Sequence, residues 1–179
     1  AVGGLSVGEP KDQMWRVVEV SFSHLPPDRP RYLMGVGSPG DLVEGIARGA
    51  DLFDCVLPTR LARHGTLLTP RGPLTLRNAR FATDHGPPDP DCSCRVCRTF
   101  SRAYLRHLFR AGEVLALRLA TFHNLHFVLG LVAEARRAVE KGHLPELRRR
   151  VLAAYPPRDG HVEGNGIAEG ERGERRGED

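Results

Sequence analysis

The sequence predicts an α/β fold that opens with a strand–helix–strand repeat and continues into a run of helices. Two short apolar strands, at 31–34 and 50–56, flank a capped helical segment of about ten residues. This order of elements favours a parallel sheet or a barrel. Between residues 101 and 141, apolar residues recur at helical spacing in two successive segments, which predicts helices there.

The elements of the repeat follow from local signals. Residues 8–24 mix apolar and charged positions and predict a helix that ends before Pro26. The next helix is expected to start at Ser38, because this serine is followed by a proline and, three residues after the cap, by an acid. Gly49 is expected to end that helix, and the strand at 50–56 is expected to be buried.

The repeat is interrupted after the second strand. Two short apolar runs between Thr66 and Leu76 predict a hairpin, and a last helix is expected from Leu144 to Tyr155. The Gly-, Glu- and Arg-rich tail at 156–179 has almost no apolar residues, so it cannot offset its ordering entropy. We expect this tail to be disordered.

Charge is unevenly distributed along the chain, which carries a formal net charge of +4. The tail at 156–179 holds four Arg against seven Asp or Glu, a net of −3, which leaves +7 on residues 1–155. A basic ordered part suits a polyanion such as RNA. We find no apolar run near the ~20 residues of a membrane span and no signal-like start, so we expect a cytoplasmic protein without membrane contact.

Three of the four cysteines fall within six residues, at Cys92, Cys94 and Cys97. One tight turn can wrap three such thiolates around a single ion, and a tetrahedral zinc site needs one more ligand. His123, near the expected junction of two helical segments, is the best fourth candidate, and spacing alone leaves His107 and His126 open. Four protein ligands leave no position for water or substrate, so we expect one structural Zn²⁺.

Five motifs in series carry a family resemblance. They are Gly3-Gly-Leu-Ser-Val-Gly-Glu9, Tyr32-Leu-Met-Gly-Val-Gly37, Phe53-Asp-Cys-Val-Leu-Pro-Thr-Arg60, Arg77-Asn-Ala-Arg80 and the Cys-x-Cys-x2-Cys…His set. Together they closely resemble the tRNA-guanine transglycosylases, in the bacterial rather than the eukaryotic form, over residues 3–155. The resemblance implies the C-terminal half of a (β/α)8 TIM barrel at 1–80, and a zinc-binding and helical subdomain at 81–155.

The resemblance also implies an activity, the exchange of the wobble guanine of tRNA for a 7-deazaguanine base in queuosine biosynthesis. Asp54 matches the family's nucleophile. An ionised carboxylate can stabilise the oxocarbenium-like transition state and then trap the ribose covalently. Cys55, next in the chain, is expected to point to the opposite face of the strand and to serve packing.

Other matched residues are expected to bind the base and the RNA. Gly4 and Leu5 match the backbone segment that reads the base edge, where a glycine lets the chain approach the ligand. Met34 matches an apolar lid over the base, and Gly35 lies beside the ribose in the family. On the RNA-facing loop the matching residues are Arg60 and Arg63, whose forked side chains suit phosphate and base contacts.

The family's early barrel strands and its second essential Asp lie upstream of the matched region. We therefore expect the 179-residue chain to be inactive alone. Either the gene or its sequence is a fragment, or the missing half is encoded separately and assembles with this one. A full-length enzyme is expected to be a homodimer. The alternatives are a non-catalytic RNA-binding or accessory zinc subunit, and a zinc-stabilised structural domain without a nucleic-acid partner. Retention of Asp54 in its motif favours the enzyme.

Overall fold

In the computed structural model, residues 1–5 and 8–157 are described. The disorder expected of the tail therefore falls almost entirely on residues outside this range. The chain opens with helix α1 (Lys11–Ser23), strand β1 (Tyr32–Leu33), helix α2 (Pro39–Ala47) and strand β2 (Leu52–Phe53). These elements confirm the predicted strand–helix–strand repeat.

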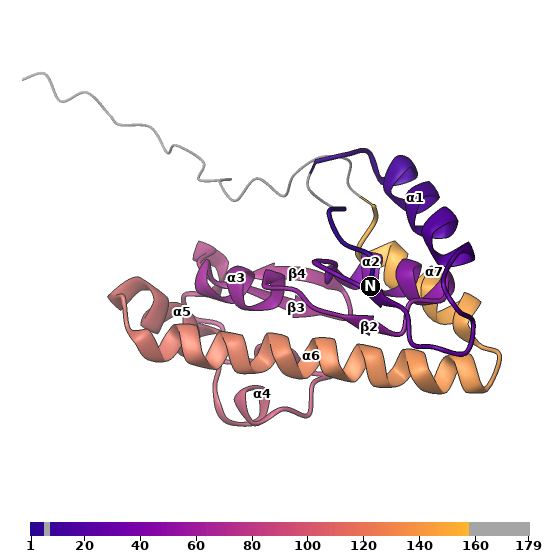
Figure 1. The fold of residues 1–179 in the computed structure, drawn as a ribbon. Coiled ribbons are helices and arrows are strands. Elements are labelled where there is room, and N and C mark those ends of the chain that lie inside the picture. Colours follow the sequence, from indigo (N-terminus) through magenta and orange to yellow (C-terminus); the bar gives the residue numbers. More distant parts are fainter. Residues whose placement is uncertain (6–7, 158–179) are drawn as a thin grey trace, which may run out of the picture.

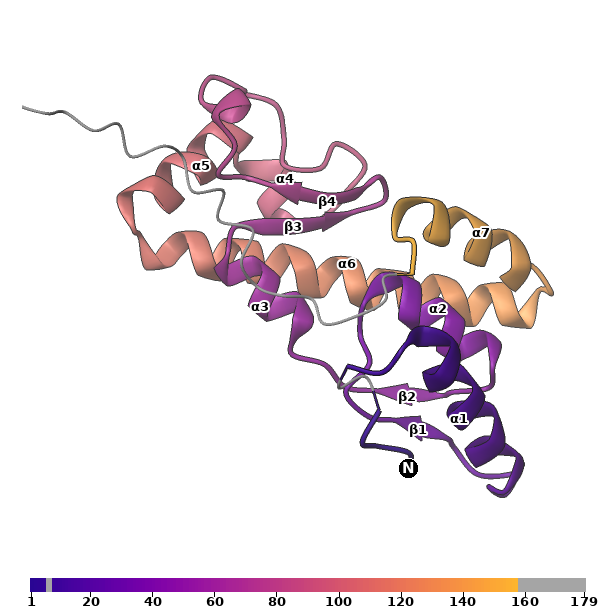
Figure 2. The same cartoon turned by 90° about the horizontal axis from the view of Figure 1, so that it is seen from above.

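The strands of this repeat run parallel, side by side in Figure 2. β1 pairs with β2, and Val2 forms a further parallel bridge to Leu33. The Val2 amide donates to the carbonyl of Tyr32 at 2.7 Å, and the Met34 amide donates to the carbonyl of Val2 at 2.9 Å. Three consecutive parallel segments, each followed by a turn or helix, therefore lie next to one another.

The start of α2 confirms the predicted cap, because Ser38 Oγ accepts a hydrogen bond from the amide of Asp41 at 3.1 Å. The prediction for the second strand is wrong in length and burial. β2 has two residues, and the Leu52 side chain is 52% exposed. The reason is that α1 and α2 pack on one side of the strand pair, against Leu33 and Phe53. On the other side, none of the residues that the structure describes covers Leu52.

The second part of the chain is built on one long helix. Helix α3 (Leu57–Arg63) leads into the antiparallel hairpin of β3 (Thr66–Thr69) and β4 (Gly72–Thr75), which confirms the predicted hairpin. A short 3-10 helix at Ala79–Phe81 follows, and then come α4 (Arg95–Thr99), α5 (Arg102–Ala111), α6 (Val114–Glu140) and α7 (Leu144–Ala154). In Figure 1, α6 runs the length of the molecule below the hairpin and α2.

The expected junction of two helical segments near His123 is wrong. α6 is continuous over 27 residues, and the break lies earlier, at Gly112, whose φ of 73° lies in the left-handed region that favours glycine. By length and composition α6 could also cross a membrane, with a mean hydropathy of 1.4 over 18 residues, against our expectation that no stretch approached this length. This is weak evidence for a span, since core helices of soluble proteins meet the same test.

Apolar packing joins the two parts of the chain. One cluster lies between α1 and β1 and includes Met14 and Leu33. A second holds the hairpin against α4, α5 and α6, and a third joins α2 to α6 and α7 through residues such as Val43 and Leu131. α2 thus connects the two parallel strands along the chain, while its apolar face packs against the helices α6 and α7.

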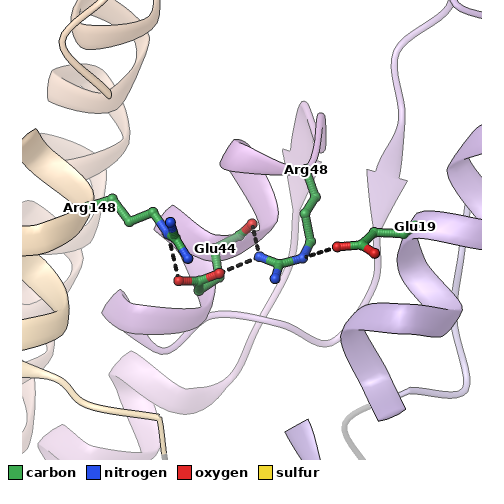
Figure 3. Close-up of polar contacts among 4 residues, drawn as sticks. All are labelled: Glu19, Glu44, Arg48 and Arg148. Carbon is green, nitrogen blue, oxygen red and sulfur yellow. Dashed lines mark hydrogen bonds and ion pairs between the residues drawn. The ribbon is translucent and has the colours of Figure 1, made fainter. Parts of the chain in front are cut away.

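A buried carboxylate ties three helices together in Figure 3. Glu44 of α2 is 5% exposed and accepts hydrogen bonds from Arg48 and, at 2.7 Å, from Arg148 of α7. Arg48 also donates to Glu19 of α1 at 2.9 Å and stacks over Trp15 with 4.7 Å to the ring centroid. Burial alone would raise the pKa of Glu44, but the two arginines outweigh burial and hold it below its usual value.

We expect Glu44→Gln to lower the free energy of unfolding by about 2 kcal/mol at neutral pH, because hydrogen bonds to a charged partner are lost. Because the pKa of Glu44 is lower in the folded than in the unfolded protein, its ionised form stabilises the fold at pH values above the unfolded pKa of 4.5. This stabilisation is lost as the pH falls through the folded pKa. Urea unfolding between pH 3 and 7 measures both effects. Glu146→Gln, at an exposed ion pair on α7, is the control and should change little. Equal effects of the two variants would contradict this role of Glu44.

Candidate active site and metal centre

Asp54 lies directly after β2, where the parallel segments end. Its Oδ1 atom accepts a hydrogen bond from the hydroxyl of Tyr32 at 2.8 Å and another from the amide of Gly35 at 3.0 Å. Gly35 follows β1 by two residues and has a φ of 74°, so a side chain there would be strained. The carboxyl ends of adjacent parallel strands meet at one edge of a sheet, which is why these groups converge.

These hydrogen bonds set the charge of the site. The Gly35 amide and then the Tyr32 hydroxyl stabilise the carboxylate, and they hold the pKa of Asp54 below its ordinary value. The same hydrogen bond to Asp54 raises the pKa of Tyr32. Asp54 is therefore an ionised, exposed carboxylate at neutral pH, and Tyr32 keeps its proton as a donor.

The residues expected to bind the base lie on neighbouring segments. Met34 is 43% exposed, and a Cβ atom added to Gly3 would lie 3.3 Å from its Sδ atom. Gly4 has a φ of 73° with open space where a side chain would be, and Leu5 packs partly against the α1 cluster. The glycine turn and Met34 thus contact each other beside an open volume.

Cys55 packs beneath the turn that follows β1. A Cβ atom added to Gly37 would lie 2.2 Å from Cβ of Cys55, so only glycine fits this approach. The Cys55 Sγ atom accepts a hydrogen bond from the amide of Leu57 at 3.2 Å, and burial raises the pKa of its thiol. A half-buried thiol whose pKa is raised in this way is suited to packing rather than to attack as a nucleophile.

Arg60 and Arg63 are exposed on α3, which begins two residues after Cys55. The position of α3 depends on Asn124, a fully buried side chain of α6. Its amide group donates to the carbonyls of Pro58 at 2.9 Å and Thr66 at 3.0 Å, and its oxygen accepts from the amide of Leu68 at 2.9 Å. Asn124 therefore fixes α3 and the first hairpin strand to the long helix.

The four predicted metal ligands lie together. Nδ1 of His123 is 3.7 Å from Sγ of Cys92, 3.6 Å from Cys94 and 3.2 Å from Cys97, and the four ligand atoms all lie within 4.8 Å of one another. Cys94 also caps α4, because its Sγ accepts a hydrogen bond from the amide of Cys97 at 3.4 Å. These residues could hold one metal ion.

The surroundings of His123 suit a ligand. Its Nε2 atom lies 2.8 Å from the carbonyl oxygen of Leu68, and a donor is required there, which leaves Nδ1 as the free lone pair that faces the thiols. Burial lowers the pKa of His123, so the ring is neutral, as a ligand must be. His107 and His126, the other two candidates, are exposed and do not belong to the group found among residues 1–5 and 8–157.

Two residues that contribute to these sites were missed by the sequence analysis. Tyr32 lies inside a quoted motif, but only Met34 and Gly35 of that motif were given roles. Asn124 follows His123 directly, and its type gives no local sign that it bonds three backbone groups. A polar residue on the buried face of a helix was the available signal.

Comparison with known proteins agrees with this geometry. Residues 1–157 match the family model described as queuine tRNA-ribosyltransferase. Proteins of that name from Desulforudis audaxviator and Caldanaerobacter subterraneus are 58% identical over 153 residues and 54% identical over 155 residues. A third, from Bacillus mycoides, is 53% identical over 155 residues.

These alignments cover 86% or 87% of this chain but 41% of each relative. The chain thus spans about two fifths of the length of the curated relatives it matches. The family model covers most of the chain, including the Asp54 motif and the four clustered metal ligands. The chain belongs to the queuine tRNA-ribosyltransferase family.

Proposed function

We propose that the full-length protein containing this chain is a tRNA-guanine transglycosylase that exchanges the wobble guanine of tRNA for a 7-deazaguanine base. The observation that carries the proposal is the ionised carboxylate of Asp54, held by Tyr32 and Gly35 beside an exposed methionine in a member of this family. A carboxylate at the C-terminal end of a barrel strand is well placed for such chemistry.

The proposed reaction has two displacements at C1′ of a flipped-out nucleotide. Asp54 attacks C1′, and guanine leaves with the electron pair of the C1′–N9 bond and takes up a proton. The incoming base then gives up its N9 proton, attacks C1′ and releases the carboxylate, so that two inversions retain the configuration. Protons balance overall, and the group that relays them is proposed to lie in the part of the protein outside this chain. No redox cofactor or nucleoside triphosphate is needed.

The base is proposed to lie against both Met34 and the glycine turn, on the open side of Gly4. The exposed thioether of Met34 would cover one face of the ring, since methionine adapts to a flat apolar surface. The backbone of Gly4 and Leu5 would read the edge of the base, and the absence of a side chain at Gly4 allows a close approach. Gly35 would lie next to the ribose.

tRNA is the proposed macromolecular partner, and Arg60 and Arg63 are proposed to contact its anticodon loop from α3. We expect the double variant Arg60→Ala, Arg63→Ala to weaken tRNA binding by about tenfold at low salt, and to flatten the slope of log affinity against log salt by about 1 to 2. Fluorescence anisotropy over a salt series measures this. Arg149→Ala, an exposed arginine on α7, is the control. An unchanged slope in the double variant would show that α3 does not contact the RNA.

For the fold, we propose that residues 1–80 are the late part of a TIM barrel and residues 81–155 a zinc-binding and helical subdomain. Support comes from the parallel segments at Val2, β1 and β2 with their crossover helices. The exposed Leu52 and Met34 suit a sheet that continues into further strands. Because α2 packs on α6 and α7, the two parts would share one apolar cluster.

The ion at the cysteine cluster is proposed to be one structural Zn²⁺. Three thiolates and a neutral imidazole are a donor set that zinc prefers, and they fill a tetrahedral shell without water. The ion would supply folding energy by joining α4, α6 and the hairpin. We further propose a homodimer in the cytoplasm, as is usual for the family.

The test of the proposed function is the incorporation of a labelled 7-deazaguanine base into tRNA by the full-length enzyme. Residues 1–179 alone serve as the negative control, since the proposed proton relay and the proposed further strands would lie outside them. Loss of labelled guanine from the wobble position must match incorporation one for one. If the full-length protein binds tRNA but exchanges no base, it is an RNA-binding protein and the proposal is refuted.

A further inference from the structure

We infer that Tyr32 is a positioning residue that leaves Oδ2 of Asp54 as the attacking oxygen and assists the carboxylate as a leaving group in the second displacement. The inference rests on the proposed function and adds a residue to which the matched motifs gave no role. It is carried by the hydrogen bonds at Asp54 and by the register of the two strands.

The strand register explains why Tyr32 reaches the carboxylate. β1 and β2 run parallel, with Tyr32 opposite Leu52. Side chains two residues apart share a face of a strand, so Asp54 lies on the same face as Leu52 and therefore as Tyr32. A long phenol that leans along its strand spans this diagonal, and its hydroxyl ends 2.8 Å from Oδ1.

The hydroxyl of Tyr32 and the amide of Gly35 both donate to the same oxygen of Asp54. Tyr32 and Gly35 donate to Oδ1, and within residues 1–5 and 8–157 no other residue donates a hydrogen bond to Oδ2. Two donors at one oxygen restrict rotation of the carboxylate. The other oxygen of this exposed carboxylate is left free of these two donors, which is the arrangement that a nucleophile needs.

The same donors act differently in the two displacements. When the Oδ2–C1′ bond forms, the carboxylate loses its charge and Oδ1 becomes the carbonyl oxygen of a neutral ester. When that bond breaks, its electron pair returns to the carboxylate and the charge develops again. Hydrogen bonds to an ionised oxygen are stronger than those to a neutral one. The Tyr32 hydroxyl therefore favours ester cleavage over ester formation, and it keeps its proton throughout.

Few other titratable groups bear on this carboxylate. Tyr32 faces it from β1, and Cys55 follows it in the chain. Arg60 of α3 and Asp41 of α2 act electrostatically on Cys55. Removal of the phenol hydroxyl should therefore act on the titration of Asp54 directly, since the pKa of this carboxyl is held down by Gly35 and by Tyr32.

The experiment compares Tyr32→Phe with the wild type in the full-length enzyme. We expect the covalent tRNA adduct to accumulate during turnover, because ester cleavage by the incoming base slows about tenfold while ester formation changes less. The acidic limb of the pH profile of kcat/KM should move to higher pH. Adduct is measured on denaturing gels, and single-turnover assays give the two rates. Tyr104→Phe, an exposed tyrosine on α5, is the control and should match the wild type.

Each outcome decides the inference. Unchanged adduct level and pH profile in Tyr32→Phe would overturn it, as would a folded variant that forms no adduct. If the phenylalanine variant does not fold, 3-fluorotyrosine at position 32 replaces it, because this stronger donor of nearly the same shape should lower the adduct level. Failure of the proposed function appears separately, as a wild-type enzyme that forms no adduct at all.

Discussion

Asp54→Asn in the full-length enzyme is expected to abolish covalent capture of tRNA and to lower base exchange by at least about 10⁴-fold. The amide has the shape of the carboxylate, and its oxygen can still accept the hydrogen bonds from Tyr32 and Gly35. It lacks the negative charge that stabilises an oxocarbenium-like centre, and it is a poor nucleophile. tRNA binding should stay within a few-fold of the wild type, because the proposed RNA contacts of Arg60 and Arg63 lie on α3.

The measurement pairs a denaturing gel, which reports the covalent adduct, with a native gel shift, which reports binding. Asp51→Asn is a matched control, since Asp51 lies at the other end of β2 and accepts a hydrogen bond from the amide of Arg31 at 2.8 Å. This control should retain the adduct. Continued exchange by Asp54→Asn would show that another group attacks the ribose, and the proposed mechanism would be wrong.

Removal of the metal is expected to have the largest effect on stability. We expect His123→Ala to release the ion and to lower the free energy of unfolding by on the order of 5 kcal/mol. His123 is fully buried, and it joins the thiols of the cysteine loop to the backbone of β3 through Leu68. Burial raises the pKa of Cys97, so without an ion the loop would hold protonated thiols that nothing links together.

Elemental analysis of the purified protein and thermal unfolding with and without a chelator measure these effects. Cys55→Ser and His126→Ala are the controls, because Cys55 lies near Asp54 and His126 is exposed outside the ligand group. Both should keep one ion per chain. A His123→Ala protein with full metal content would exclude this residue as the fourth ligand.

Local signals were sufficient for much of the fold. The cap at Ser38, the glycine at position 49 and the turn between the hairpin strands act within a few residues, so the sequence predicts them correctly. The last helix, α7, was predicted within one residue at its C-terminal end. These elements depend on contacts that the pattern of apolar and capping residues already contains.

The errors came from contacts between distant residues. α3 was not predicted, because it is short and its position depends on Asn124, 66 residues from Pro58. The continuity of α6 was missed because His123 and Asn124 interrupt its apolar pattern, although both side chains are buried and bonded. A polar pair that satisfies backbone groups of another element cannot be recognised from periodicity alone.

For the candidate site, motifs identified the groups and the structure supplied their relations. The three cysteines were recognisable from residue type and spacing, and Asp54 was recognisable through the resemblance of its motif to the family. The hydrogen bond from Tyr32 depends on which residue of β1 lies opposite which residue of β2, and single-sequence reasoning does not give strand register. The choice of His123 over His107 and His126 likewise depended on which side of its helix each histidine faces, and this is known only from the structure.

Consecutive residues on one turn of α6 perform two different tasks, because His123 faces the thiols while Asn124 holds α3 and the hairpin. An α-helix turns by about 100° with each residue. One amino acid inserted or deleted between Val114 and Phe122 would rotate both side chains away from their partners at once. The spacing along this stretch is therefore fixed more strictly than the identity of the residues within it, and length changes in related chains should be confined to the connecting loops.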